Sequence, residues 1–156
     1  MRLLIVCTGN ICRSPLGEVV VRHALTEAGL AAKTQVASAG TWDGQAGEPA
    51  DPRAVAAAAR RGYDLLGFVA RGVRRTDFTE FDVMLGMTQG HVQELESKRP
   101  RAATVAIRRY LDLSQALVLR DIADPYLGSD ADFEVALDRI EEGVAGIVAM
   151  VRAHVR

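Results

Sequence analysis

Short apolar runs alternate with longer segments of helical periodicity, and this alternation constrains the fold more than any other feature of the chain. Runs rich in aliphatic and β-branched residues predict strands over residues 2–6, 34–40, 81–88 and 103–112. Apolar residues at helical spacing predict helices over residues 14–29, 52–63, 89–99 and 133–151, with Ser14 and Asp51 as N-caps. Strands that alternate with helices predict a single α/β domain over residues 1–156, in which helices cover both faces of a four-stranded parallel sheet.

The loop after the first strand, CTGNICRS at residues 7–14, lies where such a fold binds ligands. Backbone N–H groups of a strand-to-helix loop, together with the positive end of the helix dipole, can hold an oxyanion such as phosphate. Gly9 and Asn10 suit such a loop because both tolerate left-handed backbone conformations. We therefore expect a phosphate-binding loop made of Thr8, Gly9, Asn10, Ile11, Cys12, Arg13 and Ser14.

Cys7, at the entrance to this loop, is the candidate nucleophile. The positive field of the helix N-terminus favours its thiolate over the thiol. Arg13 offers a planar fork of donors that matches two phosphate oxygens, and Ser14 can donate a hydrogen bond to the sulfur. A buried structural cysteine and an ordinary Gly-Asn turn are the alternative interpretations of these residues taken singly. The whole combination, from strand to helix, is much harder to explain by packing.

Charge and composition argue against several classes of function. The formal net charge is -1, and the 19 basic residues are spread along the chain apart from a cluster at Arg71, Arg74 and Arg75. No nucleic-acid-binding surface is therefore predicted. The opening apolar run is too short for a signal peptide, and no segment has the length of a membrane span. Together with two closely spaced cysteines, which make a poor disulfide scaffold, these features predict a cytoplasmic protein that binds neither nucleic acid nor membrane.

The stretch VCTGNICRSPLGE at residues 6–18 resembles the active-site loop of the low-molecular-weight protein tyrosine phosphatases. The resemblance continues through SAGT at 38–41, GEPADPRA at 47–54, DFTEFDVML at 77–85 and DPYLGSDADFE at 124–134. It implies a small α/β fold, no metal, no organic cofactor, and partners that are phosphotyrosine-bearing proteins or phosphate-like oxyanions. It also implies hydrolysis of phosphotyrosine and small aryl phosphates through a thiophosphate ester on Cys7, with Arg13 binding phosphate and Asp124 as general acid and base.

Asp124 makes chemical sense in that role. A phenol leaves with a pKa of about 10, so a carboxylic acid that protonates it could accelerate the reaction roughly 10²–10⁴-fold. The same carboxylate could then activate the water that hydrolyses the phosphocysteine. A turn or helix cap before Pro125 is the alternative interpretation of Asp124.

One departure from the family pattern concerns the support of the loop. Phe68 stands where the family usually has the histidine of an H-x-A-R motif. That histidine belongs to a hydrogen-bond network whose other members correspond here to Asn10, Ser14 and Ser38. Because Phe68 cannot form hydrogen bonds, we expect a network that is shorter or completed by water.

Other departures concern residues near the substrate. Thr88 replaces the usual aspartate after the third strand, and Gly44 replaces the usual aromatic of the substrate cleft. Trp42 lies two residues before Gly44 and is a candidate cleft residue. Tyr126 is the other candidate, because it is expected to pack on the aromatic ring of the substrate; an ordinary half-buried loop tyrosine is the alternative.

Other functions are compatible with parts of this pattern. Thioredoxin-coupled arsenate reductases share the fold and the loop but relay oxidation through further cysteines, whereas this chain has only Cys7 and Cys12. Protein arginine phosphatases have threonine where Ile11 stands, and the bulkier apolar Ile11 favours a phosphoester substrate. A phosphoryl-binding module without turnover would need neither the nucleophile Cys7 nor the acid Asp124.

Cys12 and the histidines complete the set of candidate chemical groups. Cys12 is the expected redox partner, which would capture an oxidised Cys7 as a Cys7–Cys12 disulfide; a small apolar packing residue is the alternative. His23, His91 and His154 are widely separated on predicted helices and indicate no metal site. We interpret all three as solvated or half-buried.

Overall fold

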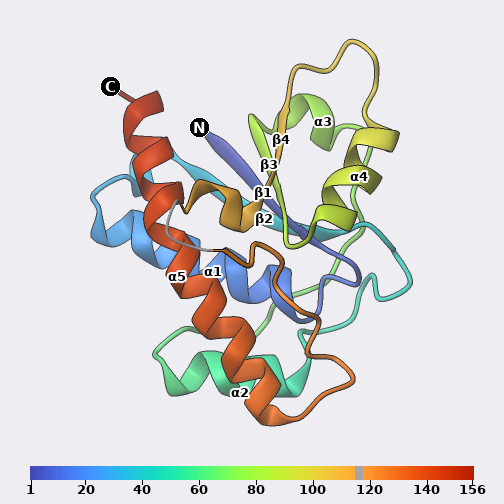
Figure 1. Ribbon diagram of the computed structural model, residues 1–156, viewed down its shortest axis with the longest axis vertical. Coiled ribbons are helices and arrows are strands. Elements are labelled where there is room, and N and C mark those ends of the chain that lie inside the picture. Colours follow the sequence, from blue (N-terminus) through green and yellow to red (C-terminus); the bar gives the residue numbers. More distant parts are fainter. Residues whose placement is uncertain (115–117) are drawn as a thin grey trace.

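The computed structural model describes residues 1–114 and 118–156, and within them four strands form one parallel sheet (Figure 1). The strands are β1 (Arg2–Cys7), β2 (Gln35–Gly40), β3 (Val83–Gly86) and β4 (Ala106–Arg109). The α-helices are α1 (Arg13–Glu27), α2 (Pro52–Arg60), α3 (Asp77–Glu80), α4 (Gln89–Lys98) and α5 (Asp130–His154). Short 3₁₀ helices form η1 (Ala31–Lys33) and η2 (Tyr110–Leu113). The predicted α/β class is confirmed.

The strand order β2-β1-β3-β4 places the first strand in the interior of the sheet. The chain passes from β1 to β2 on one side and then returns to β3 on the other, so the strand order reverses at β1. Cys7 pairs with Gly40 of β2, and Val6 pairs with Gly86 of β3. The loops that follow β1 and β3 therefore leave the same edge of the sheet beside each other. Residues 7–14 lie at the switch point, as predicted.

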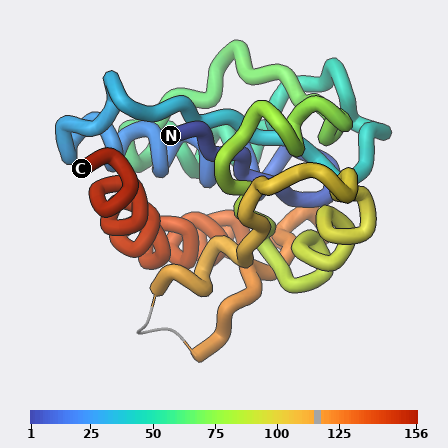
Figure 2. The backbone as a smooth tube through the Cα atoms, turned by 90° about the horizontal axis from the view of Figure 1, so that it is seen from above, coloured from blue at the N-terminus to red at the C-terminus, as the bar shows by residue number. Residues whose placement is uncertain are grey.

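Alternate residues of β1 point to opposite faces of the sheet, and each face has its own apolar core. Leu3 and Ile5 belong to the larger core, which also contains residues of α1, α2 and α5. Leu4 and Val6 belong to the smaller core, with Phe78 of α3. Figures 1 and 2 show α5 and α4 on opposite sides of the molecule. Helices therefore cover both faces, which explains why the β1 sequence is apolar at successive positions.

Some element boundaries differ from the prediction. Asp51 caps α2 as predicted, since its carboxylate accepts a hydrogen bond of 2.8 Å from a backbone N–H in the first turn. Ser14 is not the N-cap of α1: the helix begins at Arg13 and Cys12 occupies the cap position. The predicted fourth strand is shorter, because the chain turns into η2 at Tyr110, a fully buried side chain. The four-residue α3 has no counterpart in the prediction.

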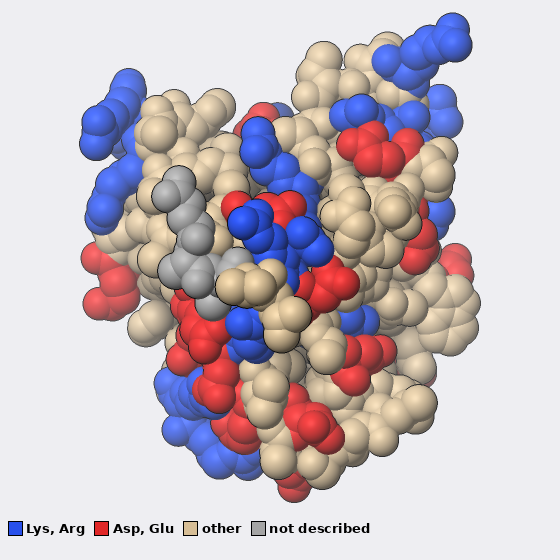
Figure 3. Space-filling model, viewed as in Figure 1, with Lys and Arg blue, Asp and Glu red and all other residues tan. Residues whose placement is uncertain are grey.

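Positive and negative side chains are interspersed on the face of the molecule in Figure 3. Many arginines pair with carboxylates; Arg109, for example, forms ion pairs with Asp112 at 2.9 Å and with Asp121 at 3.0 Å. Among the described residues, no helix combines the length and the apolar character that a bilayer span requires.

Candidate active site

The loop at residues 7–12 curls from the end of β1 into the first turn of α1. Asn10 has a positive φ of 58°, as predicted for a left-handed position. Gly9 does not have a positive φ. A Cβ at position 9 would lie 3.4 Å from Gln45 Cγ, an ordinary van der Waals contact, so the space there does not require glycine. Gly40 of β2 does allow a close approach, because a Cβ there would overlap the Thr8 carbonyl oxygen.

The Cys7 side chain lies at the floor of this loop, almost fully buried. Its Sγ lies 2.9 Å from Ser14 Oγ. Asn10 Nδ2 donates to the same Ser14 oxygen at 2.8 Å, so the Ser14 hydroxyl hydrogen is left to donate to the sulfur. The competing acceptor, the Ala39 carbonyl, is farther away at 3.5 Å. A chain of hydrogen bonds thus runs from Asn10 through Ser14 to the candidate nucleophile.

Asn10 also connects the loop to the rest of the fold. Its Nδ2 donates to Ser38 Oγ at 3.0 Å, and its Oδ1 accepts from the Arg71 N–H at 2.9 Å. Ser38 Oγ donates in turn to Glu18 Oε2 at 2.6 Å. The side chain of Asn10 therefore has partners in α1, in β2 and in the segment before α3.

Phe68 lies outside this network, and its half-buried ring packs against the larger apolar core. Its segment reaches Asn10 through the Arg71 backbone N–H. As expected, position 68 contributes no hydrogen bond, and the network ends instead at the Glu18 carboxylate, a member that the sequence analysis did not include. Glu18 lies four residues after Ser14 on the same helix, and this spacing was a signal in the sequence that the two side chains share a face.

Arg13, the first residue of α1, is buried beside the loop. Its Nη1 donates to the Ile122 carbonyl at 2.9 Å, and its Nη2 forms an ion pair with Asp124 Oδ2 at 3.4 Å. Its Nε is buried and has no hydrogen-bond partner among the described residues. A buried donor without a partner is unfavourable, and an oxyanion next to Cys7 would supply the acceptor. The site therefore favours an anion.

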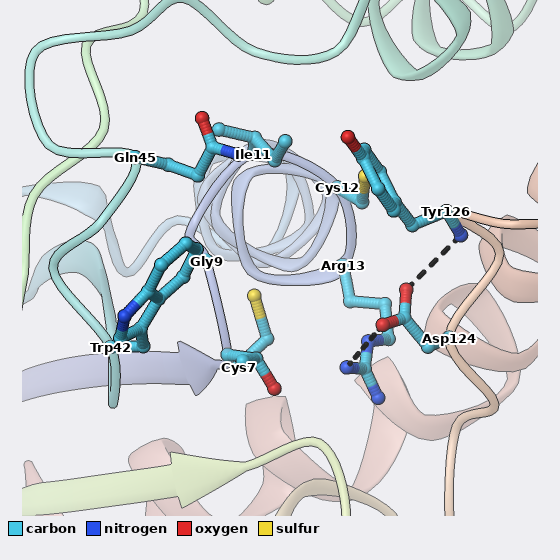
Figure 4. A pocket seen from close by; sticks show the side chains of 10 residues that line it. Cys7, Gly9, Ile11, Cys12, Arg13, Trp42, Gln45, Asp124 and Tyr126 are labelled. Atoms are coloured by element: carbon cyan, nitrogen blue, oxygen red, sulfur yellow. Dashed lines mark hydrogen bonds and ion pairs between the residues drawn. The ribbon is translucent and has the colours of Figure 1, made fainter.

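A pocket opens above Cys7, and Figure 4 shows the side chains that line it. Trp42 and Tyr126 stand on opposite sides of the opening, with the Cys7 sulfur between them. Both aromatic side chains are about half exposed. The Trp42 indole lies over Gly44, where any Cβ would overlap the ring. Position 42 thus supplies an aromatic side chain that position 44 lacks, and Gln45 is a lining residue that sequence reasoning missed.

The loop that carries Asp124 is anchored at its start by residues that follow β3. The Ile122 N–H donates to the Met87 carbonyl at 2.9 Å, and the Asp121 carboxylate accepts from the Gln89 N–H at 2.9 Å. Asp124 itself accepts from a backbone N–H of its own turn at 3.1 Å, and its side chain remains 53% exposed. It can therefore exchange protons with both a leaving group and water.

Arg53 of α2, also missed by sequence reasoning, holds the other end of that loop. Its guanidinium donates to the carbonyls of Tyr126 at 2.8 Å and Gly128 at 3.1 Å, and lies 4.5 Å from the centroid of the Phe133 ring. It also pairs with Asp51 at 2.9 Å. The hydrogen bonds that Arg53 donates to the Asp51 carboxylate hold the pKa of Asp51 below its ordinary value.

Cys12 is a buried residue of the loop that lines the pocket, and both it and Cys7 are free thiols. Burial, together with the nearby charge of Asp51, raises the pKa of the Cys12 thiol to about 12. Cys12 is therefore protonated at neutral pH.

The interpretation of the histidines holds for His23 and His154, which are exposed, but is wrong for His91. His91 is 4% exposed, and its Nε2 lies 2.9 Å from Thr8 Oγ1. It lies in the first turn of α4, the helix that follows β3, and the chain leaves β3 beside the loop of residues 7–12. That position at the switch point was the signal that His91 belongs to the site.

Comparison with known proteins gives relatives that cover nearly the whole chain. A family model described as low molecular weight phosphotyrosine protein phosphatase matches residues 2–156. The low molecular weight protein-tyrosine-phosphatase of Streptomyces coelicolor is 38% identical over 157 residues, covering 99% of this chain and 95% of that protein. The low molecular weight phosphotyrosine protein phosphatase of Homo sapiens is 35% identical, covering 85% and 84%. The crystal structure of protein tyrosine phosphatase from Entamoeba histolytica with Hepes in the active site has a TM-score of 0.93 and 29% identity, covering 100% and 99%.

Proposed function

Because the chain belongs to the low molecular weight phosphotyrosine protein phosphatase family, we propose that Cys7, Arg13 and Asp124 hydrolyse phosphotyrosine in the pocket described above. One observation carries the assignment. The candidate nucleophile, an arginine with a free buried donor and an exposed carboxylate all line the same pocket, although Asp124 is more than a hundred residues from the other two in the chain.

The first step is attack of the Cys7 thiolate on phosphorus. The S–P bond forms, the P–O bond to the tyrosine breaks, and protonated Asp124 gives its proton to the departing phenolate oxygen. Arg13 and the backbone N–H groups of the loop bind the phosphoryl oxygens, whose charge they stabilise during transfer. The Ser14 hydroxyl, 2.9 Å from Sγ, stabilises the thiolate before the attack.

The second step is hydrolysis of the phosphocysteine. Asp124, now a carboxylate, takes a proton from a water molecule that attacks phosphorus. A P–O bond forms, the S–P bond breaks, and Cys7 leaves as a thiolate that Ser14 stabilises again. Inorganic phosphate is then released.

The walls of the pocket suit an aryl phosphate. Trp42 and Tyr126 face each other across the opening, and both offer aromatic surface to a ring whose phosphate reaches Cys7. Ile11 adds apolar surface to the same pocket. A phosphotyrosine fills this space with its ring, whereas a phosphoserine side chain brings no ring to it.

The experiment that tests these roles compares two substrates. Asp124→Asn should slow hydrolysis of a phosphotyrosine peptide by roughly 10²-fold or more, and should slow an aryl phosphate with a low-pKa leaving group much less, because that group leaves without a proton. Asp43→Asn, an exposed carboxylate outside the pocket lining, is the matched control and should behave as wild type. Equal losses on both substrates would assign Asp124 to structure.

Two further measurements separate this function from the alternatives. Cys7→Ser should fall below roughly a thousandth of the wild-type rate while it still binds phosphate; a higher rate would exclude Cys7 as nucleophile. When phosphotyrosine, phosphoserine and phosphoarginine peptides are assayed side by side, the phosphotyrosine peptide should be hydrolysed fastest. Preference for phosphoarginine would make the chain an arginine phosphatase.

A thiolate nucleophile also indicates the cellular compartment in which the protein acts. Cys7 and Cys12 must both stay reduced for activity, and the cytoplasm keeps thiols reduced. The proposed setting is therefore the cytoplasm, and the proposed partners are phosphotyrosine-bearing proteins.

A further inference from the structure

His91 is buried between the first turn of α4 and the phosphate-binding loop, and both of its ring nitrogens have partners. Nδ1 accepts a hydrogen bond of 3.2 Å from the Thr88 N–H and lies 3.1 Å from Thr88 Oγ1. Thr88 Oγ1 accepts from the His91 N–H at 3.2 Å, so the two residues form a reciprocal cap of the helix. Nε2 lies 2.9 Å from Thr8 Oγ1.

These contacts determine where the ring carries its proton. A backbone N–H can only donate, so Nδ1 of His91 must be the acceptor and must lack a hydrogen. The neutral ring therefore carries its hydrogen on Nε2, which donates to Thr8 Oγ1. The Thr8 oxygen is then the acceptor in this contact, and its own hydroxyl hydrogen is free to donate elsewhere.

Thr8 follows the nucleophile directly and lines the pocket. Its backbone is fixed independently, because its carbonyl accepts from the Trp42 N–H at 3.0 Å and the preceding Cys7 carbonyl accepts from the Thr41 N–H at 2.8 Å. Among the described residues, the Thr8 hydroxyl has one hydrogen-bond contact, the one from His91. The orientation of that hydroxyl is therefore set by His91.

We propose that His91 is a positioning residue for the phosphatase reaction: its Nε2–H holds Thr8 so that the Thr8 hydroxyl donates its hydrogen to an oxygen of the bound phosphoryl group. This inference rests on the proposed function of the same pocket. Under this proposal, the segment after β3 takes part in binding the phosphoryl group together with the loop after β1.

The charged groups that act on the pKa of His91 are Arg13, Asp121 and Asp124. Burial, helped by the positive charge of Arg13, lowers the pKa of His91 to about 4, against the opposing effect of the two carboxylates. The ring is therefore neutral at physiological pH, in the one tautomer that can serve both Thr88 and Thr8. A second proton, on Nδ1, would face the Thr88 N–H, and two donors would oppose each other.

Two amide variants separate the helix cap from the contact with Thr8. In His91→Asn the amide lies near the position of Nδ1, so its oxygen can accept from the Thr88 N–H, but it is too short to reach Thr8. In His91→Gln the amide nitrogen lies near the position of Nε2 and can donate to Thr8, but the acceptor for Thr88 is lost. A structural role predicts that His91→Gln is the more harmful change to activity. The proposed role predicts that His91→Asn is.

The measurements are steady-state kinetics on an aryl phosphate, inhibition by inorganic phosphate, and thermal unfolding. His91→Asn should lower kcat/KM and weaken inhibition by phosphate, each roughly 10-fold, as expected for loss of one hydrogen bond to a charged group, with little change in melting temperature. His91→Gln should melt lower but retain more of the kcat/KM. His154→Asn, at the exposed end of α5, is the control for the substitution itself.

Thr8→Val supplies the second arm, because it removes the hydroxyl without changing the shape of the side chain. It should reproduce the kinetic loss of His91→Asn, and the double variant should lose no more than either single variant. Wild-type kinetics in Thr8→Val or His91→Asn, or additive losses in the double variant, would overturn the proposal. A wild-type protein without phosphatase activity would instead overturn the proposed function, so the two failures are distinguishable.

Discussion

Replacement of Asn10 should reveal how much of the loop's order comes from side-chain hydrogen bonds and how much from backbone strain. The Asn10 side chain makes three hydrogen bonds, to Ser14 Oγ at 2.8 Å, to Ser38 Oγ at 3.0 Å and from the Arg71 N–H at 2.9 Å. Each is worth about 1 kcal/mol net, so their loss should cost about 3 kcal/mol.

The two variants Asn10→Gly and Asn10→Ala share that loss but differ in the backbone. Glycine adopts the φ of 58° without strain, whereas alanine pays about 1–2 kcal/mol there. The greater freedom of glycine in the unfolded chain offsets about 0.5–1 kcal/mol of that difference. Asn10→Gly should therefore lower the free energy of unfolding by about 3 kcal/mol, and Asn10→Ala by somewhat more.

Urea unfolding at pH 7, followed by tryptophan fluorescence, measures both values, and the slope with denaturant should stay constant if the unfolded state is unchanged. Saturating phosphate should stabilise both variants less than wild type, because a looser loop binds the anion more weakly. A loss under about 1 kcal/mol in Asn10→Gly would refute the reasoning, since it would mean that the network does not hold the loop. A glycine variant less stable than the alanine variant would refute the argument from backbone strain.

Three further outcomes are expected. His91 has a folded-state pKa of about 4, below its ordinary 6.5, so the unfolded chain binds the proton first and the free energy of unfolding should fall as pH drops from about 6.5 to about 4. Urea unfolding of His91→Asn should show a weaker dependence of that free energy on pH over this range, and an equally steep dependence would contradict the assignment. After peroxide treatment, a dithiol should restore activity to wild type but not to Cys12→Ser, because Cys12 and an oxidised Cys7 sulfenic acid condense to a disulfide and water; equal recovery would rule out that protection. Phosphate should raise the melting temperature of Phe68→His more than that of wild type, because an imidazole that adds hydrogen bonds to the loop network orders the loop in advance and tightens anion binding; an equal or smaller shift in the variant would show that position 68 does not control the loop.

The parts of the site that are local in sequence were predictable. The apolar run of β1, the position of Cys7 at its end and the cap at Asp51 each depend on neighbours within a few residues. These signals gave the class of fold, the switch-point loop and the nucleophile. The resemblance to a family added Asp124, whose sequence context alone favours an ordinary turn or cap.

The parts that depend on packing between distant segments were not predictable in this way. In the sequence, His91 looks like an ordinary helical residue. It reaches Thr8, 83 residues away in the chain, because β1 and β3 are neighbours in the sheet. Glu18 has a visible spacing from Ser14, but its role requires Ser38 of the neighbouring strand. The error at Ser14 is local by contrast: its hydroxyl is used by Cys7 and Asn10, within the same loop, and so does not cap the helix.

The bond from Arg13 to the Ile122 carbonyl has a consequence for how the enzyme forms. It joins residues 109 positions apart, whereas the contact between β1 and β2 joins segments about a third as far apart. Contacts between distant segments form late, because closing a long loop of chain costs conformational entropy before the contact is made. During refolding, the far-ultraviolet circular dichroism signal should therefore recover before phosphate binding does. A nascent chain in which Ile122 is still inside the ribosome should already contain Cys7 but should have no phosphatase activity.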